Sequence, residues 1–184
     1  MRTLCFLTIA ISLAVTTKGT LAAAEPSAVV QNVAAQVYFS PQGGCTEAVV
    51  HEIQNAQHTI FVQAYSFTSN PIAKALVEAA RSGVLVGVIL DKSQRTEKYS
   101  GADFIAHAGI HVVIDEKPAI AHSKVMIIDG STVITGSFNF TSSAEERNVE
   151  NLLILRSVDL AKSYQQNWNE RHAASVVFVA HDER

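Results

Sequence analysis

Residues His122 to Asn139 read HSKVMIIDGSTVITGSFN. Two apolar runs rich in β-branched residues, 125–128 and 132–135, flank the pair Asp129-Gly130. An Asp-Gly pair between two such runs is the strongest short-range sequence signal for a tight β-hairpin. We therefore predict that this stretch folds as two antiparallel strands joined by a two-residue loop.

The expected register of the hairpin brings polar side chains together. A two-residue loop places Lys124 opposite Thr135, and His122 opposite Ser137. A lone His-x-Lys pair would mark only the solvated end of a strand, but here a second polar cluster reaches the same place. Because side chains alternate between the two faces of a strand, one face gathers four of them. They belong to His122, Lys124, Ser137 and Asn139.

This polar set suits a phosphate ester. Lys124 supplies a cation, and His122 can act as a nucleophile or carry a proton near neutral pH. Ser137 and Asn139 add neutral hydrogen-bond donors. No carboxylate accompanies His122 and Lys124 on this face, as a metal site would usually need. We therefore expect neither a metal ion nor another cofactor, and we expect Lys124 and the neutral donors to offset the phosphate charge.

The spacing of these residues resembles the HKD signature of the phospholipase D superfamily. The similarity covers most of the chain after residue 25, and it is closest to the short bacterial endonucleases of Nuc type, which carry a single HKD motif. In addition, Asn148 to Asn151 before an apolar run resembles the strand that, in this family, delivers a glutamate to the active-site histidine. The motif itself reads His122-x-Lys124-x4-Asp129, followed by Gly136-Ser137-x-Asn139.

The resemblance implies an α/β fold with a mixed β-sheet sandwiched between helices. It also implies hydrolysis of phosphodiester bonds of DNA, with RNA left open, through a covalent phosphohistidine at His122. Lys124 and Asn139 would bind the non-bridging oxygens. Ser137 would add a donor, and Glu150 would orient the imidazole. Since the chain has one motif, the resemblance further implies a homodimer in which two copies of His122 share one active site, one attacking and one protonating.

We assign the third residue of the motif, Asp129, to structure and not to catalysis. With Gly130 it forms the hairpin loop, and turn chemistry alone explains an aspartate before a glycine. The rise of an extended strand puts it roughly 20 Å from His122. Gly136 is likewise taken as a structural member of the motif.

Two alternatives remain open from the sequence. The first is a phospholipase D that acts on lipid head groups, with the same chemistry and another leaving group. No amphipathic helix or hydrophobic loop typical of membrane binding is evident in the mature chain, which favours nucleic acid. The second is a catalytically silent nucleic-acid-binding module, which the presence of His122 argues against, because binding alone does not require a nucleophile.

Apolar periodicity along the chain independently predicts alternating strands and helices, and therefore an α/β domain. Residues 140–147 read as irregular. The expected strands are 36–39, 59–67, 84–90, 111–114, 148–155 and 175–180. The expected helices run from a Thr46 cap to near Gln57, from the Ser69-Asn70-Pro71 cap to Gly83, over 102–108, and from a Ser157 cap to Trp168.

Residues 1–24 have the features of a secretory signal peptide, with a basic start, a short apolar core and a small-residue end. We expect cleavage after Ala24, a domain over 25–184, no stable membrane anchor, and a periplasmic or secreted protein. The formal charge of −3 becomes −5 when Arg2 and Lys18 are removed. A negative chain gains little from its overall field in binding DNA, so the polyanion must be met locally.

Two further features of the sequence are Cys45 and the segment 91–101. Cleavage removes Cys5, so Cys45 is expected to be a buried free thiol. Residues 91–101 interleave basic and acidic side chains, and they are read first as a solvated connection and second as a basic lip over the site.

Overall fold

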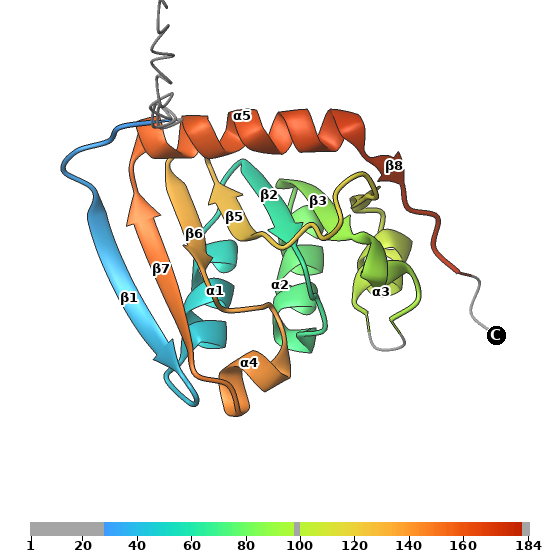
Figure 1. Cartoon of the computed structure of the whole chain (residues 1–184), viewed down its shortest axis with the longest axis horizontal. Coiled ribbons are helices and arrows are strands. Elements are labelled where there is room, and N and C mark those ends of the chain that lie inside the picture. The colour runs from blue at the N-terminus through green and yellow to red at the C-terminus, as the bar shows by residue number, and fades with distance from the viewer. Residues whose placement is uncertain (1–27, 98–99, 182–184) are drawn as a thin grey trace, which may run out of the picture.

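A mixed β-sheet forms the centre of the protein, with helices on both faces (Figure 1). The computed structural model describes residues 28–97 and 100–181. The strands are β1 (Ala34–Ser40), β2 (Thr59–Ala64), β3 (Leu85–Asp91), β4 (His111–Asp115), β5 (Lys124–Ile128), β6 (Thr132–Gly136), β7 (Glu150–Arg156) and β8 (Val176–Val177). The helices are α1 (Cys45–Gln54), α2 (Asn70–Arg81), the 3₁₀ turn η1 (Lys92–Arg95), α3 (Ala102–His107), α4 (Ser142–Glu146) and α5 (Val158–Ala174).

The sheet runs in the order β1-β7-β6-β5-β2-β3-β4-β8. β2, β3 and β4 are parallel, and α2 and η1 with α3 form the connections between them. All other neighbouring strands are antiparallel. The predicted α/β class with a mixed sheet between helices is confirmed.

Two apolar layers hold the helices to the sheet. The larger layer packs one face of the sheet against α1, α2 and α3. The smaller one lies under α5, where Ala161 and Trp168 contact strand residues that include Val125 and Ile127. Trp168 Nε1 also donates a hydrogen bond of 3.0 Å to Val62 O, so α5 is fixed across the sheet at a defined position.

The structure confirms the hairpin but shifts its register by one residue. Thr135 pairs with Val125 and not with Lys124, so the predicted two-residue loop was wrong. The extra loop residue is Ser131, whose carbonyl oxygen accepts a hydrogen bond of 2.9 Å from Ser157 N. Ser131 is therefore held at the junction between β7 and α5 instead of joining the ladder.

The start of α1 also differs from the prediction. Thr46 does not cap the helix, which begins at Cys45 after Gly44. The carboxylate of Glu145, from α4, instead accepts hydrogen bonds from Gly44 N (3.0 Å) and Thr46 N (2.6 Å). A negative group at a helix N-terminus satisfies free N–H donors and the helix dipole together. The cap comes from a residue 99 positions away, which no local pattern reveals.

Other element boundaries also differ from the prediction. Residues 140–147, expected to be irregular, contain α4, whose N-terminal Thr141 accepts a side-chain hydrogen bond from Ala144 N. The Ser157 cap is present, but α5 continues past Trp168 to Ala174. β2 ends at Ala64, before Phe67, and α1 ends at Gln54, before Gln57. The expected final edge strand is the short β8.

Cys45 is a buried free thiol at the start of α1. Burial and the nearby charge of Glu145 raise its pKa to about 11. The expected signal peptide, residues 1–24, lies outside the described residues. Within the part of the chain that is described, no helix is long and apolar enough to cross a membrane.

Candidate active site

The polar residues of the motif meet where four neighbouring strands end or begin. β2 ends beside Lys124, the first residue of β5, because Ala64 pairs with Lys124. β6 ends at Gly136, and β7 begins at Glu150. Together these strand ends form a shallow depression of about 360 Å³. Its lining residues are His122, Lys124, Gly136, Ser137, Asn139 and Glu150.

His122 and Lys124 are in direct contact. The Lys124 ammonium lies 2.9 Å from His122 Nδ1 and donates a hydrogen bond of 2.7 Å to the His122 carbonyl oxygen. Lys124 is 7% exposed, whereas His122 is exposed. The Lys124 ammonium is therefore buried and fixed by the His122 backbone, while the His122 imidazole faces solvent.

Burial makes the charged form of Lys124 less favourable. Burial lowers the pKa of its ammonium below the usual value, and the negative charge of Glu150 works in the opposite direction. Taking a cation out of water is unfavourable unless other groups stabilise it. An anion placed in this depression would supply such stabilisation.

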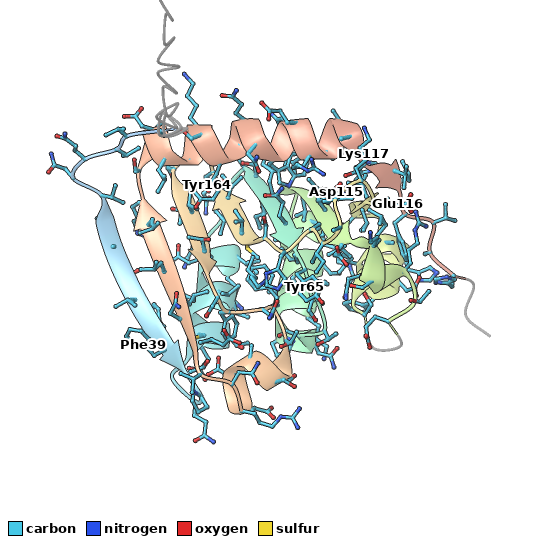
Figure 2. All side chains as sticks on the ribbon, in the orientation of Figure 1. Phe39, Tyr65, Asp115, Glu116, Lys117 and Tyr164 are labelled. Atoms are coloured by element: carbon cyan, nitrogen blue, oxygen red, sulfur yellow. The ribbon has the colours of Figure 1, made fainter. Side chains whose placement is uncertain are left out.

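Tyr65 is a member of the site that the sequence did not reveal (Figure 2). Its ring lies 4.5 Å from the His122 imidazole, centroid to centroid, and Lys124 Nζ lies 5.1 Å from the centre of the same ring. Tyr65 N donates to Ser123 O at 3.0 Å, which ties it to the segment that carries His122. Its position directly after the buried run of β2 was the available signal, but recognising it required the antiparallel pairing of β2 with β5.

Ser137 and Asn139 reach the depression through a β-bulge. Ser137 N and Phe138 N both donate to Asn151 O, at 3.1 and 3.2 Å, so two residues oppose one. Gly136 begins this bend with φ +147°, and a side chain there would collide with the Asn151 carbonyl. The expected gathering of polar groups therefore arises from a bulge and not from regular alternation along the hairpin.

The two donors differ in how they are held. Ser137 Oγ accepts hydrogen bonds from Asn151 N at 3.0 Å and from Asn151 Nδ2 at 3.3 Å, which leaves its own proton free to donate. Among the described residues, Asn139 Oδ1 is the one buried side-chain atom without a hydrogen-bond partner. Buried polar groups without partners carry a cost that native structures seldom bear without a reason.

Glu150 borders the depression but does not contact His122. Its Oε1 accepts a hydrogen bond of 3.1 Å from Asn148 Nδ2. The position that a carboxylate would take beside His122 Nδ1 is occupied by the Lys124 ammonium. Within the described residues, Glu150 is also the only carboxylate that lines the depression.

Asp129 lies in the hairpin loop, at the end of β5 opposite to Lys124. Its carboxylate accepts hydrogen bonds of 2.8 Å from the backbone N–H groups of Gln57, His58 and Thr59. Burial raises the pKa of Asp129, but these three donors outweigh it, and the pKa lies below its usual value. Asp129 thus joins the hairpin to the start of β2.

The connection after β3 supports the site from outside. Lys92 Nζ donates to Pro118 O at 3.0 Å, and Arg95 forms an ion pair of 2.9 Å with Glu116. Lys92 and Arg95 therefore bind residues of the loop after β4, which agrees with a structural role for this connection. Buried Asp91 accepts a hydrogen bond of 2.7 Å from Ala121 N, directly before His122.

Comparison with known proteins agrees with this geometry. A family model described as cardiolipin synthase, PLD-like domain, matches residues 49–172. The phospholipase D of Rickettsia conorii is 44% identical over 137 residues, which cover 74% of this chain and 68% of that protein. The mitochondrial cardiolipin hydrolase of Xenopus laevis is 31% identical over 136 residues, which cover 72% of this chain and 65% of that protein.

A solved structure gives the same result. The crystal structure of Nuc from Salmonella typhimurium, described as a phospholipase D family member, superposes with a TM-score of 0.77 at 37% identity. The match covers 80% of this chain and 99% of that chain. Sequence and fold therefore agree, and the chain belongs to the phospholipase D superfamily of phosphodiesterases.

Proposed function

We propose that the protein is an endonuclease that hydrolyses phosphodiester bonds of DNA through a covalent phosphohistidine at His122. The observation that supports this most directly is the donor set around His122. The buried cation of Lys124, the Ser137 hydroxyl with its free proton and the side-chain NH₂ of Asn139 all border one depression. Such donors stabilise the charge that develops on a phosphate during displacement.

The first step forms a bond between His122 nitrogen and phosphorus and breaks a bond from phosphorus to an ester oxygen. Lys124, Ser137 and Asn139 hold the non-bridging oxygens during this displacement. The departing alkoxide takes a proton from a second, protonated histidine. In the second step, water attacks phosphorus after losing a proton to that histidine, and the phosphohistidine bond breaks.

The contact between Lys124 and His122 prepares this sequence. A phosphate oxygen competes with His122 Nδ1 for the Lys124 ammonium, because a charge-assisted bond to an anion is the stronger one. Once Nδ1 is released, the ring proton moves through solvent from Nε2 to Nδ1, so that Nδ1–H donates a hydrogen bond to Glu150 and the lone pair on Nε2 is free to attack. Glu150 then orients the imidazole and stabilises its charged form.

The second histidine comes from a second copy of the chain. The motif occurs once in the sequence, and the exposed position of His122 allows two imidazoles to meet at a two-fold axis. An isologous homodimer brings identical residues together in this way. In each turnover one His122 attacks and the other protonates the leaving group.

DNA is preferred as the substrate over phospholipid. The match to Nuc, in both fold and sequence, extends over 99% of the Nuc chain. The names of the relatives in Rickettsia and Xenopus support the alternative, a phospholipase D acting on lipid head groups. The long helix α5 turns its apolar residues toward the sheet, so it offers no apolar face to a bilayer.

A direct assay tests the proposal. Purified protein lacking residues 1–24 is incubated with supercoiled plasmid in excess EDTA, beside the His122→Asn variant and beside phospholipid vesicles. We expect plasmid nicking without a metal ion, no nicking by the variant, and little release of head groups. Activity that needs a divalent ion, or release of head groups without nicking, would contradict the proposal.

Export completes the proposed function. We propose that residues 1–24 direct the chain to the periplasm or the medium, and that cleavage follows Ala24. N-terminal sequencing of the exported protein should give Glu25 as the first residue. An intact N-terminus in the cell interior would refute this assignment.

A further inference from the structure

A second pocket lies next to the site, on the side of the sheet covered by α5. It has a volume of about 220 Å³, and His122 lines both this pocket and the depression of the candidate active site. Its walls come from the end of β2, the segment 115–123 and the C-terminal part of α5. A group bound here would lie directly beside the reacting phosphate.

Gln63 is the central polar residue of this pocket. Its ladder partners, Ile89 and Val125, belong to the layer under α5, so the Gln63 side chain is directed to the same face. Gln63 is 7% exposed as a whole residue, and no hydrogen bond to its side-chain amide occurs among the described residues. The amide atoms are not among the buried atoms without a partner, so they reach the open space of the pocket, where a bound group can pair with them.

The rest of the pocket combines fixed polar groups with apolar walls. Arg171 donates from Nε and from a terminal nitrogen to buried Asp115, which lies beneath the C-terminal part of α5 (Figure 2). Asn167 is four residues before Arg171 on α5 and therefore shares its face. Pro118 and Ile120, from the segment before His122, supply apolar surface to the lining.

We propose that this pocket binds one nucleobase of the strand that is being cut, next to the scissile phosphate. This inference rests on the proposed function. A nucleobase has apolar faces and a polar edge, which match the Pro118 and Ile120 wall and the amides of Gln63 and Asn167. A carboxamide pairs through two hydrogen bonds with adenine, so adenine is the base expected at this position.

A base can enter a pocket only when it is unpaired and unstacked, so single-stranded DNA is the appropriate probe. Single-stranded oligonucleotides randomised around the cleavage site are cut by the protein, and the ends are sequenced. We expect adenine to be enriched at one fixed position by about fivefold or more. Gln63→Met, which keeps the volume and removes the amide, should abolish the enrichment.

Controls separate this inference from the proposed function. Gln166→Met removes an amide from α5 outside the pocket and should keep the enrichment. Turnover of bis(p-nitrophenyl) phosphate, which carries no base, should be unchanged in both variants. Asn167→Ala, on an exposed residue, provides a second test should Gln63→Met fail to fold.

Several results would overturn the inference. These are DNA cleavage without any base preference, an unchanged preference in Gln63→Met and Asn167→Ala, or a changed oligomeric state in these variants, which would mean that a second copy fills the pocket. Turnover of the chromogenic ester without cleavage of any DNA would instead refute the proposed function, and this inference with it.

Discussion

Asp129→Asn is expected to damage folding and to spare chemistry. The carboxylate of Asp129 accepts three backbone hydrogen bonds, from Gln57 to Oδ2 and from His58 and Thr59 to Oδ1. An asparagine keeps one acceptor oxygen, which can retain the bonds to Oδ1. Its NH₂ group then faces the N–H of Gln57, so that bond is lost and two donors oppose each other.

The size of the effect follows from these bonds. A hydrogen bond to a charged group contributes about 1.5–3 kcal/mol. Asp129→Asn loses one such bond and weakens the other two through the loss of charge. Because the site is partly exposed, the free energy of unfolding should fall by about 2–3 kcal/mol. For a domain of this size the thermal midpoint should fall by about 4–12 °C.

The pH dependence of this loss has a definite sign. The folded-state pKa of Asp129 lies below its usual value, so its stabilising effect is fully present above the unfolded pKa of about 3.9. This contribution disappears as the pH falls through the folded pKa. The difference in stability between wild type and Asp129→Asn should therefore be constant near neutral pH and shrink below about pH 4.

Thermal unfolding and turnover of bis(p-nitrophenyl) phosphate, measured well below the midpoint, separate the two roles. His122→Asn is the matched comparison, because it replaces an exposed side chain and should keep the wild-type midpoint while losing turnover by about 10³-fold or more. Asp129→Asn should show the reverse pattern. An Asp129→Asn protein with the wild-type midpoint and no turnover would refute the structural assignment.

Two further predictions concern the chemistry. Because a pair of histidines must start with one neutral and one protonated ring, turnover should follow a bell-shaped pH profile, and a steady rise to high pH would contradict the pair. Tyr65→Phe should keep turnover within about twofold, whereas Tyr65→Leu should lower it by about 2- to 30-fold, the equivalent of a cation–π contact. In Tyr65→Leu the pKa of Lys124, already lowered by burial, should fall further, so loss of activity should begin at lower pH. Equal profiles for both Tyr65 variants would exclude this role.

The sequence predicted the main elements because their signals are local. The apolar run of β3 and the Ser157 cap of α5 each depend on neighbouring residues, and both were found. The family resemblance added the packing of the mixed sheet between helices and the roles of the polar residues, whereas the order of the strands was not predicted. Local signals therefore explain most of the agreement.

The differences arise where distant residues decide the conformation. Ser131 left the hairpin ladder because it bonds to Ser157, and α1 is capped by Glu145 instead of Thr46. Tyr65 joined the site only because β5 lies beside β2. Gln63 was not predicted as a binding residue for the same reason. A glutamine in an apolar strand indicates a binding role only when the pocket beside it is known.

The shared active site is the central claim, and mixed dimers test it most directly. Wild-type and His122→Asn chains are refolded together in varying ratios, and plasmid nicking is measured against the mutant fraction. If two copies of His122 form one site, an equal mixture leaves only about a quarter of the dimers active, and the curve is quadratic. A straight line, with about half of the activity at equal mixing, would mean that each chain carries its own complete site.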